Sequence, residues 1–326
     1  MGSPHFTIWC DGHFPPDVME ELRNGVGAHR LVFPKSVSGS ILQTSGPDPL
    51  LETADIAFGQ PDADQIVRST SLKWIQLTTA GYTRYDRDDV KAALLQRSAA
   101  LTNSSSVYDE PCAQHLLAMM LALSRQLPQC VEEQRGDRSW QIDKHRQHSY
   151  LLRGQRALIM GFGAIGRRVA ELLGPLRMNL VVMRRSPRGD EPGLTIRPEE
   201  VEDTLPWCDH ILDILPDNAS TKKFMGRGRF ERMNPSAIFY NIGRGTTVDQ
   251  DALAAALYEH RIAAAYLDVT DPEPLPPAHP LWSAPNCYIT PHIAGGHANE
   301  FDRLVKHFLG NLKLFEAGAP LNDRVI

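Results

Sequence analysis

Three residues in the second half of the chain could together transfer a proton and bind an anion: Arg244, Glu273 and His292. A histidine can donate or accept a proton near neutral pH, and a nearby carboxylate favours its protonated form. An arginine can hold a carboxylate and polarise an adjacent carbonyl through its planar fork of N–H donors. Beside a nicotinamide ring, this set could reduce a 2-oxo acid, with His292 protonating the alkoxide. Each residue taken alone could equally be a surface ion or a turn cap.

All three residues follow short apolar runs that are typical of buried strands. In open parallel sheets, ligands bind beyond the carboxyl ends of the strands. We therefore expect Arg244, Glu273 and His292 at one edge of one sheet, together with Pro216. The runs that precede these four residues are 237–242, 263–269, 286–290 and 210–215.

A glycine-rich turn earlier in the chain could bind the phosphates of a dinucleotide. Gly161, Gly163 and Gly166 follow the apolar run 157–160 and open an amphipathic helix. In such a turn, the first glycine permits the tight bend, the second lets a pyrophosphate approach the backbone, and the third lets helix pack on strand. The helix N-terminus offers free N–H groups and a positive dipole to the phosphates. We predict a dinucleotide site here; a strand-to-helix turn without a ligand is the alternative.

The next expected strand, 180–183, is followed by Arg184, Arg185 and Ser186. NAD sites usually place Asp or Glu at this point, where it accepts hydrogen bonds from the adenosine ribose. A carboxylate would repel a 2′-phosphate, whereas a guanidinium can hold one through paired hydrogen bonds. We therefore expect NADP(H) to be preferred, with NAD(H) still possible. The alternative is that the two arginines are ordinary solvated surface charges.

Composition limits the class of protein. The 326 residues are long for one core and sufficient for two domains. A net charge of -5 argues against a nucleic-acid partner, which would favour a basic surface. The five cysteines are scattered and lack CxxC spacing, so we expect reduced thiols and neither disulfides nor a metal site. No signal-peptide pattern or membrane-spanning apolar stretch is visible, and we expect a cytoplasmic protein without a membrane partner.

The first hundred or so residues alternate apolar runs with polar or helical segments. This alternation predicts a smaller α/β domain with a parallel sheet. Within it, the loop 78–82 places Ala80 and Gly81 after a strand, where backbone N–H groups could bind a substrate carboxylate. The expected strands are 6–10, 30–33, 55–58, 74–78 and 99–102.

Other segments connect or cover the two sheets. A buried helix is expected to start near Pro111, with His115 as a packed, hydrogen-bonded histidine. The polar segment 127–153 is expected to be an arm laid across a partner subunit, and a disordered loop is the alternative. Residues 187–198 are expected to form a loop, and 299–317 a helix with one apolar face.

Four motifs together resemble the D-isomer-specific 2-hydroxyacid dehydrogenase family over nearly the whole chain: GFGAIG, NIGRGTTVD, AAAYLDVTDPEPLP and HPLWSAPNCYITPHIAG. The resemblance implies an α/β protein with two parallel sheets flanked by helices. A Rossmann-type cofactor domain, 104–295 with an arm at about 127–153, would be inserted in a discontinuous flavodoxin-like substrate domain, 1–103 and 296–326. The resemblance also implies an active site between the domains and a homodimer.

Residue by residue, the resemblance implies that Arg244, Glu273 and His292 are catalytic. Arg244 and His292 would contact the substrate together with Ala80 and Gly81, and Asp268 would meet the nicotinamide carboxamide. The residues expected to bind the coenzyme are Gly161, Gly163, Ala164, Ile165, Gly166, Arg184, Arg185, Ser186, Pro216, Ile242, Gly243, Arg244, Asp268, His292, Ala294 and Gly295.

Two positions depart from the family pattern. Arg184 replaces the acidic residue of NAD-using members, as in members that resemble glyoxylate and hydroxypyruvate reductases. Gln114 stands where many members have Glu.

These features predict an NADPH-dependent oxidoreductase that interconverts small 2-oxo acids and D-2-hydroxy acids. Two alternatives stay open at this point: a dinucleotide-sensing binding protein of corepressor type, and a formate- or phosphite-type dehydrogenase. Tight NADPH binding without turnover of any 2-oxo acid would favour the sensor. Reduction of NADP+ by formate or phosphite would favour the other dehydrogenases.

Overall fold

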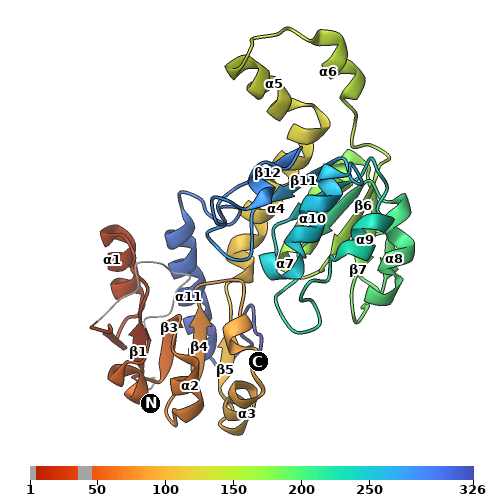
Figure 1. Ribbon diagram of the computed structural model, residues 1–326. Coiled ribbons are helices and arrows are strands. Elements are labelled where there is room, and N and C mark those ends of the chain that lie inside the picture. Colours follow the sequence, from red (N-terminus) through yellow and green to blue (C-terminus); the bar gives the residue numbers. More distant parts are fainter. Residues whose placement is uncertain (1–4, 36–45) are drawn as a thin grey trace. The chain divides into compact units, whose positions relative to one another are not determined.

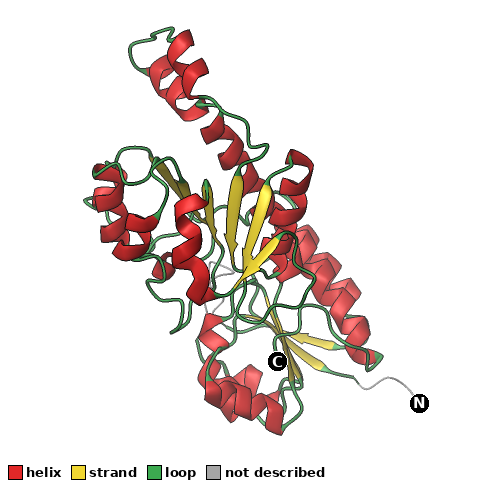
Figure 2. Cartoon of the chain, turned by 90° about the vertical axis from the view of Figure 1, so that its right-hand side faces the viewer, coloured by secondary structure: helices red, strands yellow, loops and turns green. Residues whose placement is uncertain are grey.

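The protein is represented by a computed structural model that describes residues 5–35 and 46–326 (Figure 1). These residues form two compact units, one within Met1–Tyr108 and His297–Ile326 and the other within Asp109–Gly296. Each unit is built around one parallel sheet, and Figure 2 shows helices flanking the strands. The predicted α/β class with two parallel sheets is therefore confirmed.

The first unit contains a five-stranded sheet in the order β2-β1-β3-β4-β5. Its five strands agree with the apolar runs expected from the sequence. Helix α11 covers it, and the ring of Phe308 stacks on Phe58 and Trp74 at centroid distances of 4.2 and 5.3 Å. The elements are β1 Thr7–Cys10, α1 Pro16–Gly25, β2 Arg30–Val32, β3 Ile56–Gly59, α2 Ala63–Arg68, β4 Trp74–Leu77, α3 Asp88–Gln96, β5 Ala100–Thr102 and α11 Glu300–Glu316.

The second unit contains a seven-stranded sheet in the order β12-β11-β10-β9-β6-β7-β8. Strand order reverses beside β6, because the chain runs outward through β7 and β8 and then returns to β9 on the other side of β6. Such a switch point leaves a crevice at the carboxyl ends of the strands. The elements are β6 Arg156–Met160, α7 Ala164–Leu173, β7 Asn179–Met183, β8 Leu194–Ile196, α8 Val201–Thr204, β9 His210–Asp213, α9 Arg227–Arg232, β10 Ile238–Asn241, α10 Gln250–Tyr258, β11 Ala264–Leu267 and β12 Cys287–Ile289.

Two expectations about individual elements were wrong. Helix α4, Ser105–Ser124, contains Pro111 in its interior and begins six residues before it. The side chain of Asn103 accepts a hydrogen bond from the Ser105 amide, so the helix has its own start signal upstream of the proline. Residues 187–198 are not all loop, because β8 pairs in parallel with β7 through Val181–Leu194 and Met183–Ile196.

The segment 127–153 forms two short helices, α5 Leu127–Arg135 and α6 Ile142–His148. Figure 1 shows both helices extending away from the sheet of their own unit. Several apolar side chains along the segment are exposed, and Trp140 is 90% exposed. Across the two described stretches, none of the helices is both long and apolar enough to cross a membrane.

Candidate active site

The glycine turn between β6 and α7 is shaped to receive a phosphate-bearing ligand. Gly161 has φ 101°, and a Cβ atom there would lie 2.8 Å from the Ile214 carbonyl oxygen. A Cβ at Gly166 would lie 2.2 Å from the Gly161 oxygen, so helix and strand pack closely here. A Cβ at Gly163 would meet no protein atom within 4 Å, which leaves its backbone open to a ligand. These three environments fit the pyrophosphate role expected from the motif.

The end of β7 shows how the expected coenzyme-selecting residues are placed. Arg185 and Ser186 are exposed, whereas the Arg184 side chain is only 16% exposed. Nη1 of Arg184 lies 2.8 Å from Oε1 of Glu191 and 3.6 Å from Oδ1 of Asp190. Arg184 is therefore held by acidic residues of the loop that follows it, and is not a freely solvated surface charge.

His292 and Glu273 form a direct pair. Nδ1 of His292 lies 2.8 Å from Oε2 of Glu273, and the other carboxylate oxygen accepts a hydrogen bond from the Thr270 amide at 3.1 Å. Burial alone would raise the pKa of the Glu273 carboxyl. The hydrogen bond and charge of His292, the Thr270 amide and the charge of Arg244 offset that effect, and the pKa lies below its usual value. Glu273 is thus an ionised partner that accepts a hydrogen bond from Nδ1–H of His292.

The loop that carries His292 is fixed by Asp268. His292 has φ 53°, in the left-handed region that non-glycine residues rarely adopt, and its amide donates to the Asp268 carbonyl oxygen at 2.8 Å. The Asp268 carboxylate accepts hydrogen bonds from the amides of Ile293 and Ala294, each at 2.9 Å, and from the Thr290 hydroxyl at 2.6 Å. Asp268 therefore positions the histidine loop. Its expected contact with a nicotinamide carboxamide stays a prediction.

Arg244 follows β10, and two hydrogen bonds fix its main-chain carbonyl group. Its carbonyl oxygen accepts hydrogen bonds from Nδ2 of Asn241 at 3.0 Å and from the Thr247 hydroxyl at 2.7 Å. Burial lowers the pKa of the guanidinium, while the charges of Glu273 and Asp217 act in the opposite direction. The structure thus brings the arginine within electrostatic reach of the Glu273–His292 pair.

Asp213 lies beneath this arginine loop at the end of β9, with no exposed surface. Its Oδ2 atom lies 2.7 Å from the Thr247 hydroxyl, which is also 2.7 Å from the Arg244 carbonyl oxygen. A hydroxyl has one proton, so it cannot donate to both oxygens at once. Burial raises the pKa of Asp213 to about 7, although Thr247 and the Leu215 amide oppose that shift. A protonated Asp213 would donate its own proton to the Thr247 hydroxyl oxygen, and the hydroxyl could then donate to the Arg244 carbonyl oxygen.

The remaining expected site residues divide between the units. Ala80 and Gly81 follow β4 in the first unit, where their carbonyl oxygens accept hydrogen bonds from Asn103 and Thr79, each at 2.7 Å. Their role toward a substrate stays a prediction. The residues that follow β6, β9, β10 and β12 lie in the same unit as Arg244, Glu273 and His292: Ala164, Ile165, Pro216, Ile242, Gly243, Ala294 and Gly295.

His115 is a packed histidine, as expected. Its Nε2 atom is hydrogen-bonded to the Tyr266 hydroxyl, which lies 2.5 Å from the Thr290 hydroxyl. Gln114, which departs from the family pattern, donates to Glu110 one turn earlier on α4. No group of three or more metal-ligating side chains occurs in residues 5–35 and 46–326.

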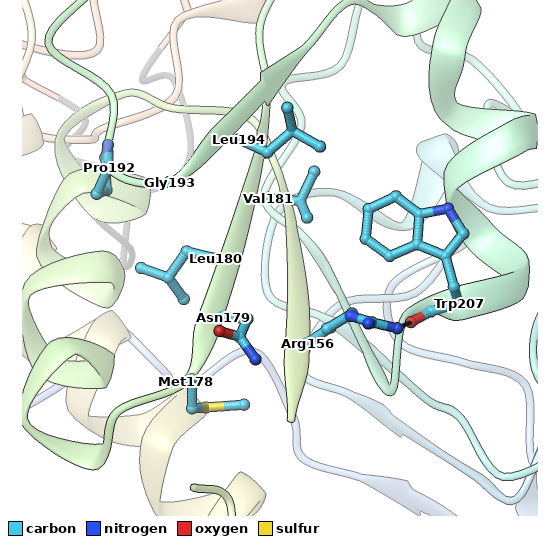
Figure 3. Close-up of a pocket in the computed structure, with 9 residues that line it drawn as sticks. All are labelled: Arg156, Met178, Asn179, Leu180, Val181, Pro192, Gly193, Leu194 and Trp207. Atoms are coloured by element: carbon cyan, nitrogen blue, oxygen red, sulfur yellow. Dashed lines mark hydrogen bonds between the residues drawn. The ribbon is translucent and has the colours of Figure 1, made fainter. Parts of the chain in front are cut away.

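A surface hollow of about 440 Å³ lies elsewhere in the second unit (Figure 3). It includes Arg156, Asn179 and Leu194, near the amino ends of β6, β7 and β8, and the Trp207 ring lies 5.4 Å from the Arg156 guanidinium. The glycine turn and the candidate residues Arg244, Glu273 and His292 come after the carboxyl ends of their strands. The hollow is therefore no part of the candidate active site.

Sequence reasoning missed the supporting roles of Asp213, Thr247 and Glu191. Asp213 could have been noticed, because a lone acidic residue in the apolar run 210–215 is unusual in a buried strand. Nothing in the sequence distinguishes Glu191 from the solvated acidic residues that surface loops commonly contain.

The chain is similar to members of one family of oxidoreductases. Residues 117–294 match the family model "D-isomer specific 2-hydroxyacid dehydrogenase, NAD binding domain". A glyoxylate/hydroxypyruvate reductase B from Pectobacterium atrosepticum is 32% identical over 268 residues, which are 78% of this chain and 80% of that protein. A glyoxylate reductase from Aeropyrum pernix is 31% identical over 79% of this chain and 77% of its own length. A D-isomer specific 2-hydroxyacid dehydrogenase from Xanthobacter autotrophicus, solved with NADPH and MES, has a TM-score of 0.81 and 24% identity over 99% of this chain and 98% of that one.

Proposed function

The chain belongs to the D-isomer specific 2-hydroxyacid dehydrogenase family of NAD(P)-dependent oxidoreductases, and we propose that it reduces a small 2-oxo acid to the D-2-hydroxy acid with NADPH. The observation that supports this most directly is the 2.8 Å contact between His292 and Glu273. This pair lies in the same unit as Arg244 and the glycine turn. The relatives' names make glyoxylate and hydroxypyruvate the first substrates to test.

The chain's own residues have distinct tasks in this reaction. Arg244 binds the substrate carboxylate and its keto oxygen through its fork of donors. A reduced nicotinamide, when bound, would supply the hydride that C2 of the substrate accepts. Nε2 of His292 donates a proton to the developing alkoxide, while Glu273 accepts a hydrogen bond from Nδ1 and stabilises the imidazolium. The same residues in reverse protonation states serve the oxidation of the hydroxy acid.

NADPH, and not NADH, is the proposed coenzyme because Arg184 occupies the position that follows β7. The structural relative from Xanthobacter autotrophicus was solved with NADPH, and one from Sinorhizobium meliloti, with 23% identity, was solved with NADP and malonate. The ratio of kcat/KM for NADPH to kcat/KM for NADH tests this choice directly. A ratio below one would rule it out.

The whole proposal is tested with a panel of 2-oxo acids graded by side-chain size. The oxidation of NADPH by each acid is measured from the loss of NADPH absorbance. Turnover of glyoxylate, hydroxypyruvate or a bulkier 2-oxo acid supports the reductase. Tight NADPH binding without turnover of any of them would instead indicate a dinucleotide sensor. NADP+ reduction by formate or phosphite would indicate the formate- or phosphite-type activity.

We also propose that the protein is a cytoplasmic homodimer that associates through the arm of α5 and α6. Exposed apolar side chains are concentrated there, among them Leu127, Trp140 and Ile142. Such residues are typical of the centre of a protein interface. None of the five cysteines forms a disulfide, and scattered cysteines without disulfides are typical of a reducing compartment.

A further inference from the structure

The loop that follows β7 contains a buried carboxylate among exposed neighbours. Residues 185–190 are exposed, but the side chain of Glu191 is only 1% exposed. Its oxygens accept hydrogen bonds from Nη1 of Arg184 at 2.8 Å and from the amides of Arg188 and Gly189, each at 2.9 Å. An ordinary surface glutamate does not collect three donors.

The two amides converge on Glu191 because the backbone turns at Gly189, which has φ 81°. Successive N–H groups in such a turn form an anion-binding concavity, and here the chain fills it with its own carboxylate. The Arg188 amide is the largest influence on the Glu191 carboxyl; together with Arg184 and the Gly189 amide it outweighs burial and lowers the pKa to about 2. Glu191 is therefore ionised throughout the physiological range.

The same contacts fix the guanidinium of Arg184. A guanidinium carries five N–H donors, and Glu191 binds it through Nη1, so Nε and Nη2 keep donors for a second anion. Asp190 ties the loop to α7, since its Oδ2 atom lies 2.9 Å from Nη1 of Arg167. Arg185 and Arg188 are exposed, so a ligand phosphate could approach the loop from solvent, whereas the Glu191 side chain is only 1% exposed.

We propose that Glu191 is a positioning residue for coenzyme selection: it holds Arg184 and the turn at 188–189 in the shape that receives the 2′-phosphate of NADPH. The proposal rests on the proposed NADPH-dependent function. The opposite possibility is that Glu191 competes with the phosphate for Arg184. If Glu191 positions Arg184, removing the Glu191 charge weakens binding of the 2′-phosphate. If Glu191 competes with the phosphate, removing the charge strengthens binding.

Calorimetric binding of two fragments separates these cases without any turnover. Adenosine 2′,5′-bisphosphate carries the selecting phosphate, and 5′-AMP lacks it. For Glu191→Gln, we expect affinity for the bisphosphate to fall ~10-fold, about the effect of losing one charge-assisted hydrogen bond. Affinity for 5′-AMP should change less than about twofold. Asp203→Asn also removes one carboxylate charge from the same unit, but at a side chain that is 91% exposed; it is the matched control and should change both affinities by less than about twofold.

Kinetics provide the second measurement. In Glu191→Gln, the KM for NADPH should rise with the bisphosphate Kd, while the KM for NADH and both kcat values stay within about twofold. Unchanged or tighter binding of the bisphosphate would overturn the proposal, and tighter binding would establish competition. If Glu191→Gln does not bind 5′-AMP, and so is not folded, Glu191→Asp takes its place. That variant keeps the charge but shortens its reach, and it should lose bisphosphate affinity in the same direction.

The same binding measurements show whether the proposed NADPH preference or only the role of Glu191 is wrong. If the unmodified protein binds 5′-AMP as tightly as the bisphosphate, the NADPH preference itself is wrong. If the unmodified protein prefers the bisphosphate and Glu191→Gln retains that preference, only the role of Glu191 is wrong.

Discussion

Nδ1 of His292 lies 2.8 Å from Oε2 of Glu273, and this contact assigns the two nitrogens of the imidazole ring. Because the ionised carboxylate accepts a hydrogen bond from Nδ1–H, Nε2 is the nitrogen available to the substrate. The left-handed backbone of His292, φ 53°, is held by the hydrogen bond from its amide to Asp268. Both the ring and the main chain of the histidine are thus fixed before any ligand arrives.

Replacing the histidine tests its role as proton donor. His292→Ala should lower kcat for a 2-oxo acid by at least ~100-fold, the usual scale of general acid catalysis, while the Kd for NADPH changes little. His260→Ala is the matched control, because His260 is exposed and also has φ 53°. It carries the same backbone strain but no proposed role. Near-normal kcat in His292→Ala would contradict the mechanism.

Replacing the arginine tests anion binding. Arg244→Lys keeps the positive charge but loses the planar fork that can hold two oxygens at once. We expect kcat/KM for the 2-oxo acid to fall by ~10- to 100-fold, mainly through a higher substrate KM, since one charge-assisted hydrogen bond is lost. Binding of NADPH, followed by fluorescence, should be nearly unchanged. A kcat/KM within twofold of the unmodified protein would show that the fork is not used.

The sequence predicted the sheet edge at which the three candidate catalytic residues lie. Arg244, Glu273 and His292 each follow an apolar run, and parallel strands bring such positions to one edge. Their grouping needed the family resemblance as well, because separations along the chain do not determine contacts between loops.

Features that depend on partners distant in sequence could not be predicted. Strand β8, Leu194–Ile196, is short, lies at a sheet edge and follows Pro192 and Gly193, so its residues look like loop. The contact between Asp213 and Thr247 joins the end of β9 to the turn after β10, 34 residues further along the chain, and no local pattern encodes it. Glu191 acquires its role only once the loop folds back on Arg184.

The arm makes a prediction about assembly. If α5 and α6 form the dimer interface, placing charges at Leu127 and Ile142, each 53% exposed, should dissociate it. The double variant Leu127→Asp and Ile142→Asp is expected to sediment as a monomer at concentrations where the unmodified protein is a dimer. Leu95→Asp, at a leucine that is 67% exposed in the other unit, should leave the sedimentation coefficient unchanged. An unaltered dimer in the double variant would place the interface elsewhere.

The buried carboxyl of Asp213 should make the free energy of unfolding depend on pH. Burial raises its pKa in the folded protein to about 7 from an ordinary value of 3.8, so the folded state binds this proton more tightly than the unfolded state does. The resulting stabilisation is complete below pH ~4 and is lost as pH rises through ~7. At about 1.4 kcal/mol per pKa unit, the loss is on the order of 4 kcal/mol.

Asp213→Asn should remove this dependence, because an amide stays neutral and its NH2 group can donate to Thr247 as the protonated acid would. Urea unfolding of the variant and the unmodified protein at several values between pH 5 and 8 gives the difference in free energy of unfolding. That difference should shift in favour of Asp213→Asn as pH rises, with the main change between pH 5 and 7. Asp203→Asn, at a side chain that is 91% exposed, should show a difference that stays constant with pH. A constant difference for Asp213→Asn as well would mean that Asp213 is ionised throughout, and Thr247 would then donate to Asp213 instead of to the Arg244 carbonyl oxygen.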